Sequence, residues 1–401
     1  MRLATRAIHA AQEPDPSTGA LAAPIFQTST YRQFEPGVNH GFEYSRTNNP
    51  TRQRLEGVLA ELEGVDHAAV FASGLAAENA VFQALLKPGD EVIIPPDVYG
   101  GTHRLLNQIY KPKGHVVTPV DYTDFAAVER AISDRTRLLW IESPTNPRLL
   151  IYDIAALAKI ARARGVIVVV DNTFATPVFQ QPFALGADLV VHSVTKYLAG
   201  HSDVIQGAVL ARDAALFEPI RYLQNASGAV PSPFDCWLTL RGLKTLELRV
   251  LRHAENAQRI AEAAATHPAV ARVYHPGLPT HPGHDVARRQ MTGFGGMVSI
   301  ELKADADQVR RFVSTRRYFA LAESLGGVNA LICHPATMTH ASIPAEDRAR
   351  LGLSDALVRL SPGIEATDDL LEDVLAGLDE IAAANKSKRS QSSTCAAAIE
   401  A

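Results

Sequence analysis

Residues 188–203 read DLVVHSVTKYLAGHSD, and the fold and function of the rest of the chain are interpreted outward from this stretch. Its apolar run is short enough to be a strand buried on both faces. The run gives way to Ser193, Thr195 and Lys196, and a lysine just past a core strand is costly unless it is exposed, paired or chemically used. Hydroxyls beside a lysine can bind a phosphate, and the lysine can bond covalently to an aldehyde. A solvated lysine at a strand end is the plain alternative.

The surrounding sequence predicts a sheet with a ligand site at one edge. From about residue 66 to 240, short Val/Ile/Leu runs such as 166–172 alternate with amphipathic helical stretches, which predicts an α/β fold with a mostly parallel sheet covered on both faces. Ligands of such sheets bind outside the carboxyl ends of the strands. Ser73, Asp171 and Lys196 each follow such a run, so we expect them to converge.

The length of 401 residues predicts one large and one smaller domain. Residues 1–50 show little periodicity and several turn signals, so we expect an N-terminal arm that contacts a neighbouring subunit. Residues 51–243 are predicted to form the large cofactor-binding domain, and residues 244–385 a smaller C-terminal α+β domain. Residues 386–401 are polar, small and aperiodic, which predicts a disordered tail.

Composition excludes several classes of partner. The 39 basic and 43 acidic residues give a net charge of −4 without a basic stripe, which argues against nucleic acid. No apolar run reaches transmembrane length and no signal-peptide pattern is present, so we expect a cytoplasmic protein that does not bind membranes. The three cysteines and fourteen histidines show no ligand spacing, and we predict no metal.

Four further positions each allow a functional and a structural interpretation. Asp171 can pair with a protonated pyridine nitrogen or cap a helix. Gly74, between a strand and a helix, belongs either to a phosphate-binding turn or to an ordinary tight turn. Tyr99 can stack on a flat aromatic ligand or close the sheet edge. Arg359, inside an apolar strand pattern, suits a substrate carboxylate or a structural salt bridge. No GxGxxG follows the first strand and no P-loop motif occurs, which argues against a nucleotide.

The chain resembles the Cys/Met-metabolism pyridoxal-phosphate enzymes, which include cystathionine γ-synthase, cystathionine β- and γ-lyases and methionine γ-lyase. The resemblance extends from about Thr5 to Leu378 and rests on the motifs YSRTNNPT, ASGLAA, DVYGGT, ESPTNP, DNTFATP, SVTKYLAGHSD, LQNASGAVPSPFDC, ESLGG, HPATMTHASIP and VRLSPGIE. It implies the PLP-dependent transferase fold type I, similar to aspartate aminotransferase. It also implies pyridoxal 5′-phosphate as cofactor, a small amino-acid substrate, and a homotetramer built as a dimer of dimers with shared active sites.

The resemblance also implies roles for individual residues. Lys196 would hold the cofactor aldehyde, Asp171 would meet the pyridine nitrogen and Tyr99 would stack on the ring. The cofactor phosphate would be held by Gly74, Leu75, Ser193 and Thr195, with Tyr44 and Arg46 reaching it from the neighbouring subunit. The substrate carboxylate would be bound by Asn146, Ser324 and Arg359.

The activity within the family is expected to be cystathionine γ-lyase, with cystathionine γ-synthase as the alternative. Three residues resemble the polar ring around the distal pocket of cystathionine-handling members, namely Glu43, Arg104 and Glu323. Gly101 stands where a methionine γ-lyase-like enzyme has cysteine, so that activity is disfavoured. Pro362 and Asn329 depart from the usual Val and acidic residue and could reshape the pocket. A non-catalytic, cofactor-binding regulatory protein is a minor alternative, and it predicts damage to the catalytic residues, which are intact.

Overall fold

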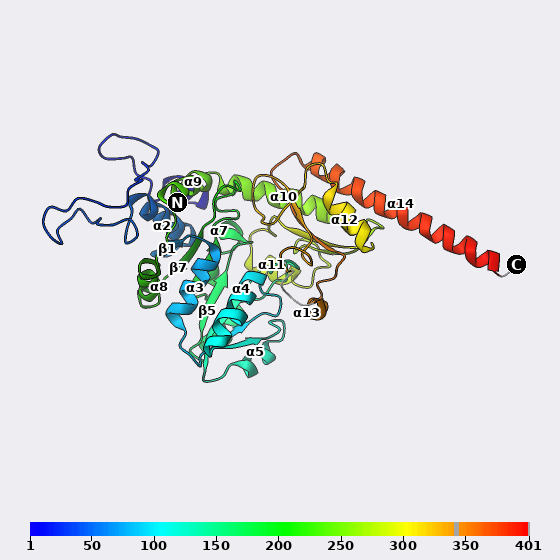
Figure 1. The fold of residues 1–401 in the computed structure, drawn as a ribbon, viewed down its shortest axis with the longest axis horizontal. Helices are drawn as coiled ribbons and strands as arrows, with labels where there is room; N and C mark the ends of the chain where they lie inside the picture. Colours follow the sequence, from blue (N-terminus) through cyan, green and yellow to red (C-terminus); the bar gives the residue numbers. More distant parts are fainter. Residues whose placement is uncertain (341–344, 400–401) are drawn as a thin grey trace.

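The computed structural model describes residues 1–340 and 345–399. It contains a seven-stranded sheet, a five-stranded sheet, an N-terminal arm and a long C-terminal helix (Figure 1). Across these described ranges, no helix is both long and apolar enough to cross a membrane, and no group of three or more His, Cys, Asp or Glu side chains is arranged to hold a metal.

The large sheet has the order β1-β7-β6-β5-β4-β2-β3. Only β7 runs antiparallel to its neighbours, β1 and β6, and the other pairs are parallel. Along the chain, β3 lies on one side of β2 and β4 on the other, so the strand order reverses at β2. Such a reversal creates a switch point where ligands of these folds bind. The strands are β1 (His67–Phe71), β2 (Glu91–Ile94), β3 (Val116–Pro119), β4 (Thr136–Glu142), β5 (Ile167–Asp171), β6 (Leu189–Ser193) and β7 (Gly207–Ala211).

Both faces of this sheet are buried, as the continuous apolar runs predict. Successive residues of β5 alternate between two hydrophobic cores: Val168 and Val170 lie in one, and Ile167 and Val169 in the other. The same alternation holds in β4, β6 and β7. Side chains on a strand point to opposite faces in turn, so a run of Val and Ile is what a strand with two covered faces requires.

Helices cover the two faces and are bounded by local sequence signals. Asn49 caps α2 by accepting hydrogen bonds from the amides of Thr51 and Arg52, and Gly64 ends that helix at a φ of 71°. The helical segments of this domain are α2 (Pro50–Glu63), α3 (Gly74–Leu85), α4 (Gly100–Arg104), η1 (Leu105–Tyr110), η2 (Lys111–Lys113), α5 (Phe125–Ala131), α6 (Ile154–Arg162), α7 (Thr176–Phe179), η3 (Pro182–Leu185), α8 (Ala214–Ser227) and α9 (Pro233–Leu243).

The second sheet has the order β10-β11-β12-β9-β8, in which only the β10–β11 pair is parallel. Its strands are β8 (Val270–Tyr274), β9 (Val298–Leu302), β10 (Ala320–Leu321), β11 (Leu331–Cys333) and β12 (Leu357–Ser361). The accompanying helices are α10 (Leu246–Ala265), α11 (His284–Gln290), α12 (Ala306–Ser314), α13 (Ala345–Arg350) and α14 (Thr367–Ile399).

The helix α10 connects the two parts of the molecule. Leu246 and Val250, near its start, belong to a core of the large sheet, whereas Ala257 and Ile260 belong to the core of the small sheet. The domain boundary predicted after residue 243 falls between α9 and α10. One face of a single helix is therefore shared between two hydrophobic cores.

The N-terminal arm is mostly irregular and extends away from the body (Figure 1). Its one helix, α1 (Leu3–His9), which the sequence did not predict, buries Ala7 against the large domain. Beyond α1 the arm exposes apolar side chains such as Leu21 (80% exposed) and Phe34 (65% exposed). Exposed apolar side chains of this density are typical of a contact surface.

The C-terminal segment differs from the predicted disordered tail. In the structure α14 continues as one helix from Thr367 to Ile399 and projects past the body (Figure 1). Residues 386–399 contain no Pro or Gly and are rich in Ala, Ser and Lys, so nothing stops a helix that is already nucleated upstream. Lys388 also pairs with Asp305 at 2.6 Å. Residues 400 and 401 lie outside the described residues.

Candidate active site

A cavity of about 680 Å³ lies at the carboxyl ends of the strands of the large sheet. It is lined by both domains, because β5 and β6 contribute residues on one side and β12 contributes Arg359 on the other. Eleven of the predicted site residues line it: Gly74, Leu75, Tyr99, Asn146, Asp171, Ser193, Thr195, Lys196, Glu323, Ser324 and Arg359. Ser73, Asp171 and Lys196, which the sequence predicted to converge at the strand ends, all line this one cavity.

Lys196 lies just beyond β6, partly buried in the cavity. Its Nζ donates a hydrogen bond to Ser324 Oγ at 2.9 Å. Burial, reinforced by the positive charge of Arg359, lowers the pKa of Lys196 to about 8. A lysine with such a pKa has a substantial neutral fraction near physiological pH, and a neutral amine is the form that can act as nucleophile or base.

An anion-binding cradle is formed by the start of α3 and the end of β6. Ser73 caps α3, accepting a hydrogen bond from the amide of Ala76 at 3.0 Å. A Cβ built on Gly74 would lie 3.0 Å from Ser193 Cβ, so any other residue here would require the strand and the helix to move apart slightly. Gly74, Leu75, Ser193 and Thr195 all line this part of the cavity, and the start of a helix favours an anion such as a phosphate. The Thr195 hydroxyl also bonds to the backbone of Gln206.

Asp171 ends β5 and faces the cavity. Its Oδ1 accepts a hydrogen bond from the amide of Thr173 at 2.9 Å, so the carboxylate does organise the following turn, although α7 begins only at Thr176. Burial raises the pKa of Asp171. Within the described residues no Lys or Arg forms an ion pair with this carboxylate, so the site lacks the cation that a carboxylate in such surroundings requires.

Tyr99 precedes α4, and its amide donates a hydrogen bond to Glu142 Oε2 at 2.7 Å. A Cβ built on Gly101 would lie 2.4 Å from Tyr99 Cε1. Glycine at this position therefore allows the ring to take its present place beside the cavity. Burial raises the pKa of Tyr99, with a second contribution from the nearby carboxyl of Glu78.

Arg359 lies in β12 and is 2% exposed. Its Nη1 donates to Asn146 Oδ1 at 2.7 Å and its Nη2 to the carbonyl of Ser324 at 2.8 Å. Both acceptors are neutral, and no salt bridge to Arg359 is formed by the residues that the structure describes, so the structural salt bridge is not observed. Ser324 has a φ of 88°, which costs a non-glycine residue about 1–3 kcal/mol and is typical of functional sites.

Four predicted site residues do not line the cavity of their own chain: Glu43, Tyr44, Arg46 and Arg104. Arg46 lies on the arm, where its Nη1 donates to the carbonyl of Asn225 at 2.9 Å and its guanidinium lies over the ring of Tyr44. Arg104 ends α4 and is exposed.

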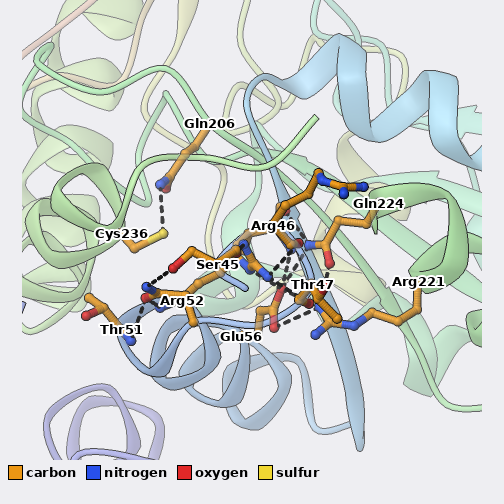
Figure 2. A network of polar contacts seen from close by, with 12 residues as sticks. Ser45, Arg46, Thr47, Thr51, Arg52, Glu56, Gln206, Arg221, Gln224 and Cys236 are labelled. Atoms are coloured by element: carbon orange, nitrogen blue, oxygen red, sulfur yellow. Dashed lines mark hydrogen bonds and ion pairs between the residues drawn. The ribbon is translucent and has the colours of Figure 1, made fainter. Parts of the chain in front are cut away.

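The arm segment that carries Arg46 is held by a buried polar network, shown in Figure 2. Arg52 of α2 donates from Nη1 to the carbonyl of Ser45 at 2.7 Å, and from Nη2 to the carbonyls of Arg46 and Thr47 at 3.1 and 3.0 Å. Arg221 pairs in turn with Glu56 at 3.0 Å. The network fixes the direction in which the arm leaves the large domain.

Three carboxyls that line the cavity were not among the predicted site residues: Glu78, Glu142 and Asp203. Glu142, at the end of β4, accepts hydrogen bonds from the amides of Tyr99 and Asn146 at 2.7 and 2.8 Å and so positions both. The signal was present, because Glu142 follows an apolar run as Asp171 does. Glu78 lies in α3, one turn after Gly74, and is 4% exposed. Helical spacing from Gly74 was its only sequence signal.

Comparison with known proteins identifies the class of enzyme. The family model for Cys/Met metabolism PLP-dependent enzymes matches residues 4–379. The chain therefore belongs to this family, its cofactor is pyridoxal 5′-phosphate, and its fold is the fold type I of these enzymes.

Within the family, the chain is similar to enzymes of cystathionine metabolism. It is 52% identical to a cystathionine β-lyase of Coxiella burnetii over 376 residues (93% of this chain, 97% of the relative). It is 53% identical to a cystathionine γ-synthase of Mycobacterium tuberculosis over 372 residues (92% and 95%). A solved cystathionine γ-lyase of Lactobacillus plantarum complexed with L-serine has a TM-score of 0.92 at 46% identity (95% and 99%). Because three activities occur at similar identity, the chain is a PLP-dependent trans-sulfuration enzyme whose particular reaction depends on its site.

Proposed function

We propose that the chain is a cystathionine γ-lyase, which cleaves cystathionine to cysteine, 2-oxobutyrate and ammonia. The observation that carries this proposal is the charge pattern of the cavity. Arg359 lies on one side without a carboxylate partner, and Glu323 lines the cavity without an ion pair among the described residues. Cystathionine carries an amino-acid group at each end, so one carboxylate can bind Arg359 while the distal ammonium meets Glu323.

The residues around the cavity fit pyridoxal 5′-phosphate. Asp171 lacks a cation, and a protonated pyridine nitrogen supplies one. The close approach of Gly74 to Ser193 forms the cradle for the phosphate. In our proposal Lys196 bonds to the cofactor aldehyde, Tyr99 stacks on the ring, and Gly74, Leu75, Ser193 and Thr195 hold the phosphate. The bound cofactor supplies an electron sink that makes the Cα proton of the substrate acidic.

The chain's own side chains then bind the substrate and move its protons. Arg359, oriented by Asn146 and by the carbonyl of Ser324, binds the α-carboxylate through its planar fork. Once the substrate amine has replaced it on the cofactor aldehyde, Lys196, whose pKa is lowered to about 8, would take the Cα proton. It would pass that proton to the bound cofactor and, neutral again, would take a proton from Cβ. Tyr99 donates a proton to the sulfur that leaves from Cγ. The enclosed part of the cavity limits access of water to these groups.

We also propose that each site is completed by a second subunit, in a homotetramer organised as a dimer of dimers. Tyr44 and Arg46 do not line the cavity of their own chain, and the arm that carries them exposes apolar side chains. Placed on a neighbouring subunit, they would reach its cofactor phosphate, and Glu43 beside them would join Glu323 in the distal pocket.

A direct comparison of the two candidate reactions tests the proposal. The purified enzyme is given cystathionine, and cysteine and 2-oxobutyrate are measured; in parallel it is given an O-acyl-homoserine plus cysteine, and cystathionine is measured. We expect the first reaction to have the larger kcat/KM. A much larger value for the second would identify a cystathionine γ-synthase, the second candidate and the named activity of the mycobacterial relative.

The role of Glu323 is tested by Glu323→Ala. Because the carboxylate is proposed to bind only the distal end of a long substrate, kcat/KM should fall about 10-fold or more for cystathionine and much less for homoserine. Glu346→Ala, an exposed change in α13, is the control and should alter neither. Equal losses on both substrates would remove Glu323 from the distal pocket.

A further inference from the structure

Besides Asp203 and Glu323, three carboxyl groups from three different elements line the cavity: Glu78 in α3, Glu142 in β4 and Asp171 in β5. They differ in the number of N–H groups that stabilise a negative charge on them. Glu142 accepts two backbone amide bonds, at 2.7 and 2.8 Å, and Asp171 accepts one at 2.9 Å. Glu78 is 4% exposed, and its Oε2 has no hydrogen-bond partner among the described residues.

Burial raises the pKa of all three carboxyls, and Glu78 is the one without a backbone N–H, in the part of the chain that the structure describes, to stabilise its ionised form. A buried carboxyl is ionised only if hydrogen bonds or a cation replace the lost solvation. Burial, followed by the negative charge of Asp171, raises the pKa of Glu78 to about 8, and the hydroxyl of the neighbouring Thr102 only partly opposes this rise. Among the described residues, Asp171 from β5 and Tyr99 from the start of α4 interact electrostatically with Glu78, and neither is cationic.

The position of Glu78 also relates it to the cofactor. Glu78 follows Gly74 by four residues, so both lie on the same face of α3, one helical turn apart. Glu78 therefore lies on the face of α3 whose first residues are proposed to hold the phosphate. Its carboxyl interacts electrostatically with both Asp171 and Tyr99. These are the two residues proposed to meet the pyridine nitrogen and the face of the ring.

We propose that Glu78 contacts the bound cofactor beside Asp171 as a neutral carboxylic acid, so that the ring edge meets one negative side chain instead of two. A neutral carboxyl donates an O–H hydrogen bond, which an ionised one cannot do. It also leaves Asp171 as the carboxylate that faces the protonated ring nitrogen. The inference rests on the proposed role of Asp171, but not on whether the enzyme is a lyase or a synthase.

The neutral state is tested on the cofactor-free protein by Glu78→Gln. Glutamine is uncharged and nearly isosteric. The pKa of Glu78 is about 8 in the folded state and near 4.5 when unfolded, so between these values the folded wild type holds a proton that the unfolded chain has lost. Wild-type stability therefore falls, relative to Glu78→Gln, as pH rises through this window. The melting temperature of Glu78→Gln should exceed that of the wild type by a few degrees at pH 8, and by much less at pH 5. A difference that does not change between pH 5 and 8 would overturn the neutral state.

The contact with the cofactor is tested by its dissociation constant and visible absorption spectrum. Glu78→Ala removes the O–H donor and should raise the Kd for pyridoxal 5′-phosphate about 10-fold and shift the absorption maximum, whereas Glu78→Gln keeps a donor and should stay within about 3-fold of the wild type at pH 7. Gln83→Ala, on the exposed face of the same helix, controls for helix stability and should leave Kd unchanged. If Glu78→Ala has the Kd and spectrum of the wild type, Glu78 does not contact the cofactor.

Asp171→Asn separates this inference from the assignment on which it depends. If Asp171 meets the ring nitrogen, Asp171→Asn weakens cofactor binding and changes its spectrum by itself. Normal binding and spectrum in Asp171→Asn would overturn that assignment, and with it the description of Glu78 as its neutral neighbour, whatever the Glu78 variants show.

Discussion

Lys196 is a partly buried amine with a lowered pKa, and this has a consequence for stability. The pKa of Lys196 is about 8 in the folded protein and 10.5 in the unfolded chain. As pH rises, the folded protein therefore loses this proton before the unfolded chain does. The cost of keeping a buried ammonium is complete below pH 8 and is relieved between pH 8 and 10.5. We expect cofactor-free Lys196→Met to be more stable than the wild type at pH 7, by at most about 3 kcal/mol, and the difference to shrink by pH 10.

The same variant tests the covalent role of Lys196. Wild-type protein loaded with the cofactor should show a visible absorption band, and borohydride should fix the cofactor to the chain. Lys196→Met should bind the cofactor without attachment, and its activity should fall about 10²–10⁴-fold or more. Mass spectrometry of the reduced protein detects the adduct. Fixed cofactor in Lys196→Met would contradict the assignment.

Gly101 controls the place of the Tyr99 ring. Any side chain at residue 101 puts Cβ 2.4 Å from Tyr99 Cε1, so the ring must move. We expect Gly101→Ala to lower kcat/KM about 10-fold or more, because small displacements of a positioned group have large effects on rate. Gly64→Ala is the control: Gly64 has a φ of 71° and open space around it, so alanine there should cost about 1 kcal/mol without changing activity. Unchanged kinetics in Gly101→Ala would show that the ring position is not critical.

The site residues at strand ends could be predicted because buried parallel strands are apolar throughout. A polar side chain such as Asp171 or Ser193 therefore marks where the strand stops. Glu78 could not be predicted in this way, since an amphipathic helix tolerates a glutamate on any face and only the fold shows which face meets a cavity. The proposed role of Arg46 involves a second subunit, whose placement no local pattern in one chain determines.

Among the elements, α2 determines how the arm leaves the body. Arg52 donates to three successive backbone carbonyls of residues 45–47, and Arg52→Leu leaves these three carbonyls without their donor, whereas Glu56 keeps its bonds from Arg221 and Gln224. We expect Arg52→Leu to destabilise the protein by about 2–4 kcal/mol and to accelerate proteolysis of the arm.

The matched control is Arg54→Leu, since Arg54 lies in the same helix and makes a single exposed bond to the carbonyl of Glu13. It should resemble the wild type in melting temperature and in the cutting rate between residues 20 and 48. Equal cutting rates in the two variants would show that the Arg52 network does not hold the arm.

The elements also show where sequence patterns are weak. The strands of the large sheet agree closely with the apolar runs because burial on both faces leaves no alternative. The helix that extends α14 to Ile399 was missed, since a helix without an apolar face has no periodicity to detect. Its composition, free of Pro and Gly from residue 386 onward, was the available signal.

For the assembled enzyme, a shared site predicts complementation between two inactive variants. Arg46→Ala lacks the proposed phosphate contact, and Lys196→Ala lacks the amine. A hybrid dimer of the two contains one site with both residues intact. Mixing equal amounts under conditions of subunit exchange should restore about one quarter of wild-type activity, because about half of the dimers are hybrids and each has one complete site of two.

The comparison requires that both variants stay folded and dimeric, which sedimentation verifies. Mixing either variant with more of itself is the control and should restore nothing. If the mixed sample stays inactive while hybrids are demonstrated by differential tagging, Arg46 acts within its own chain or not at all.

The helix α10 contributes to two hydrophobic cores at once, with Leu246 and Val250 in one and Ala257 and Ile260 in the other. If either core unfolds, half of this helix loses its apolar contacts. The other half is then destabilised too, since helical residues are stabilised cooperatively. The two domains should therefore lose structure together, in a single calorimetric transition whose van't Hoff and calorimetric enthalpies agree for each subunit. Separated by cleavage within α10, neither fragment would retain a complete core.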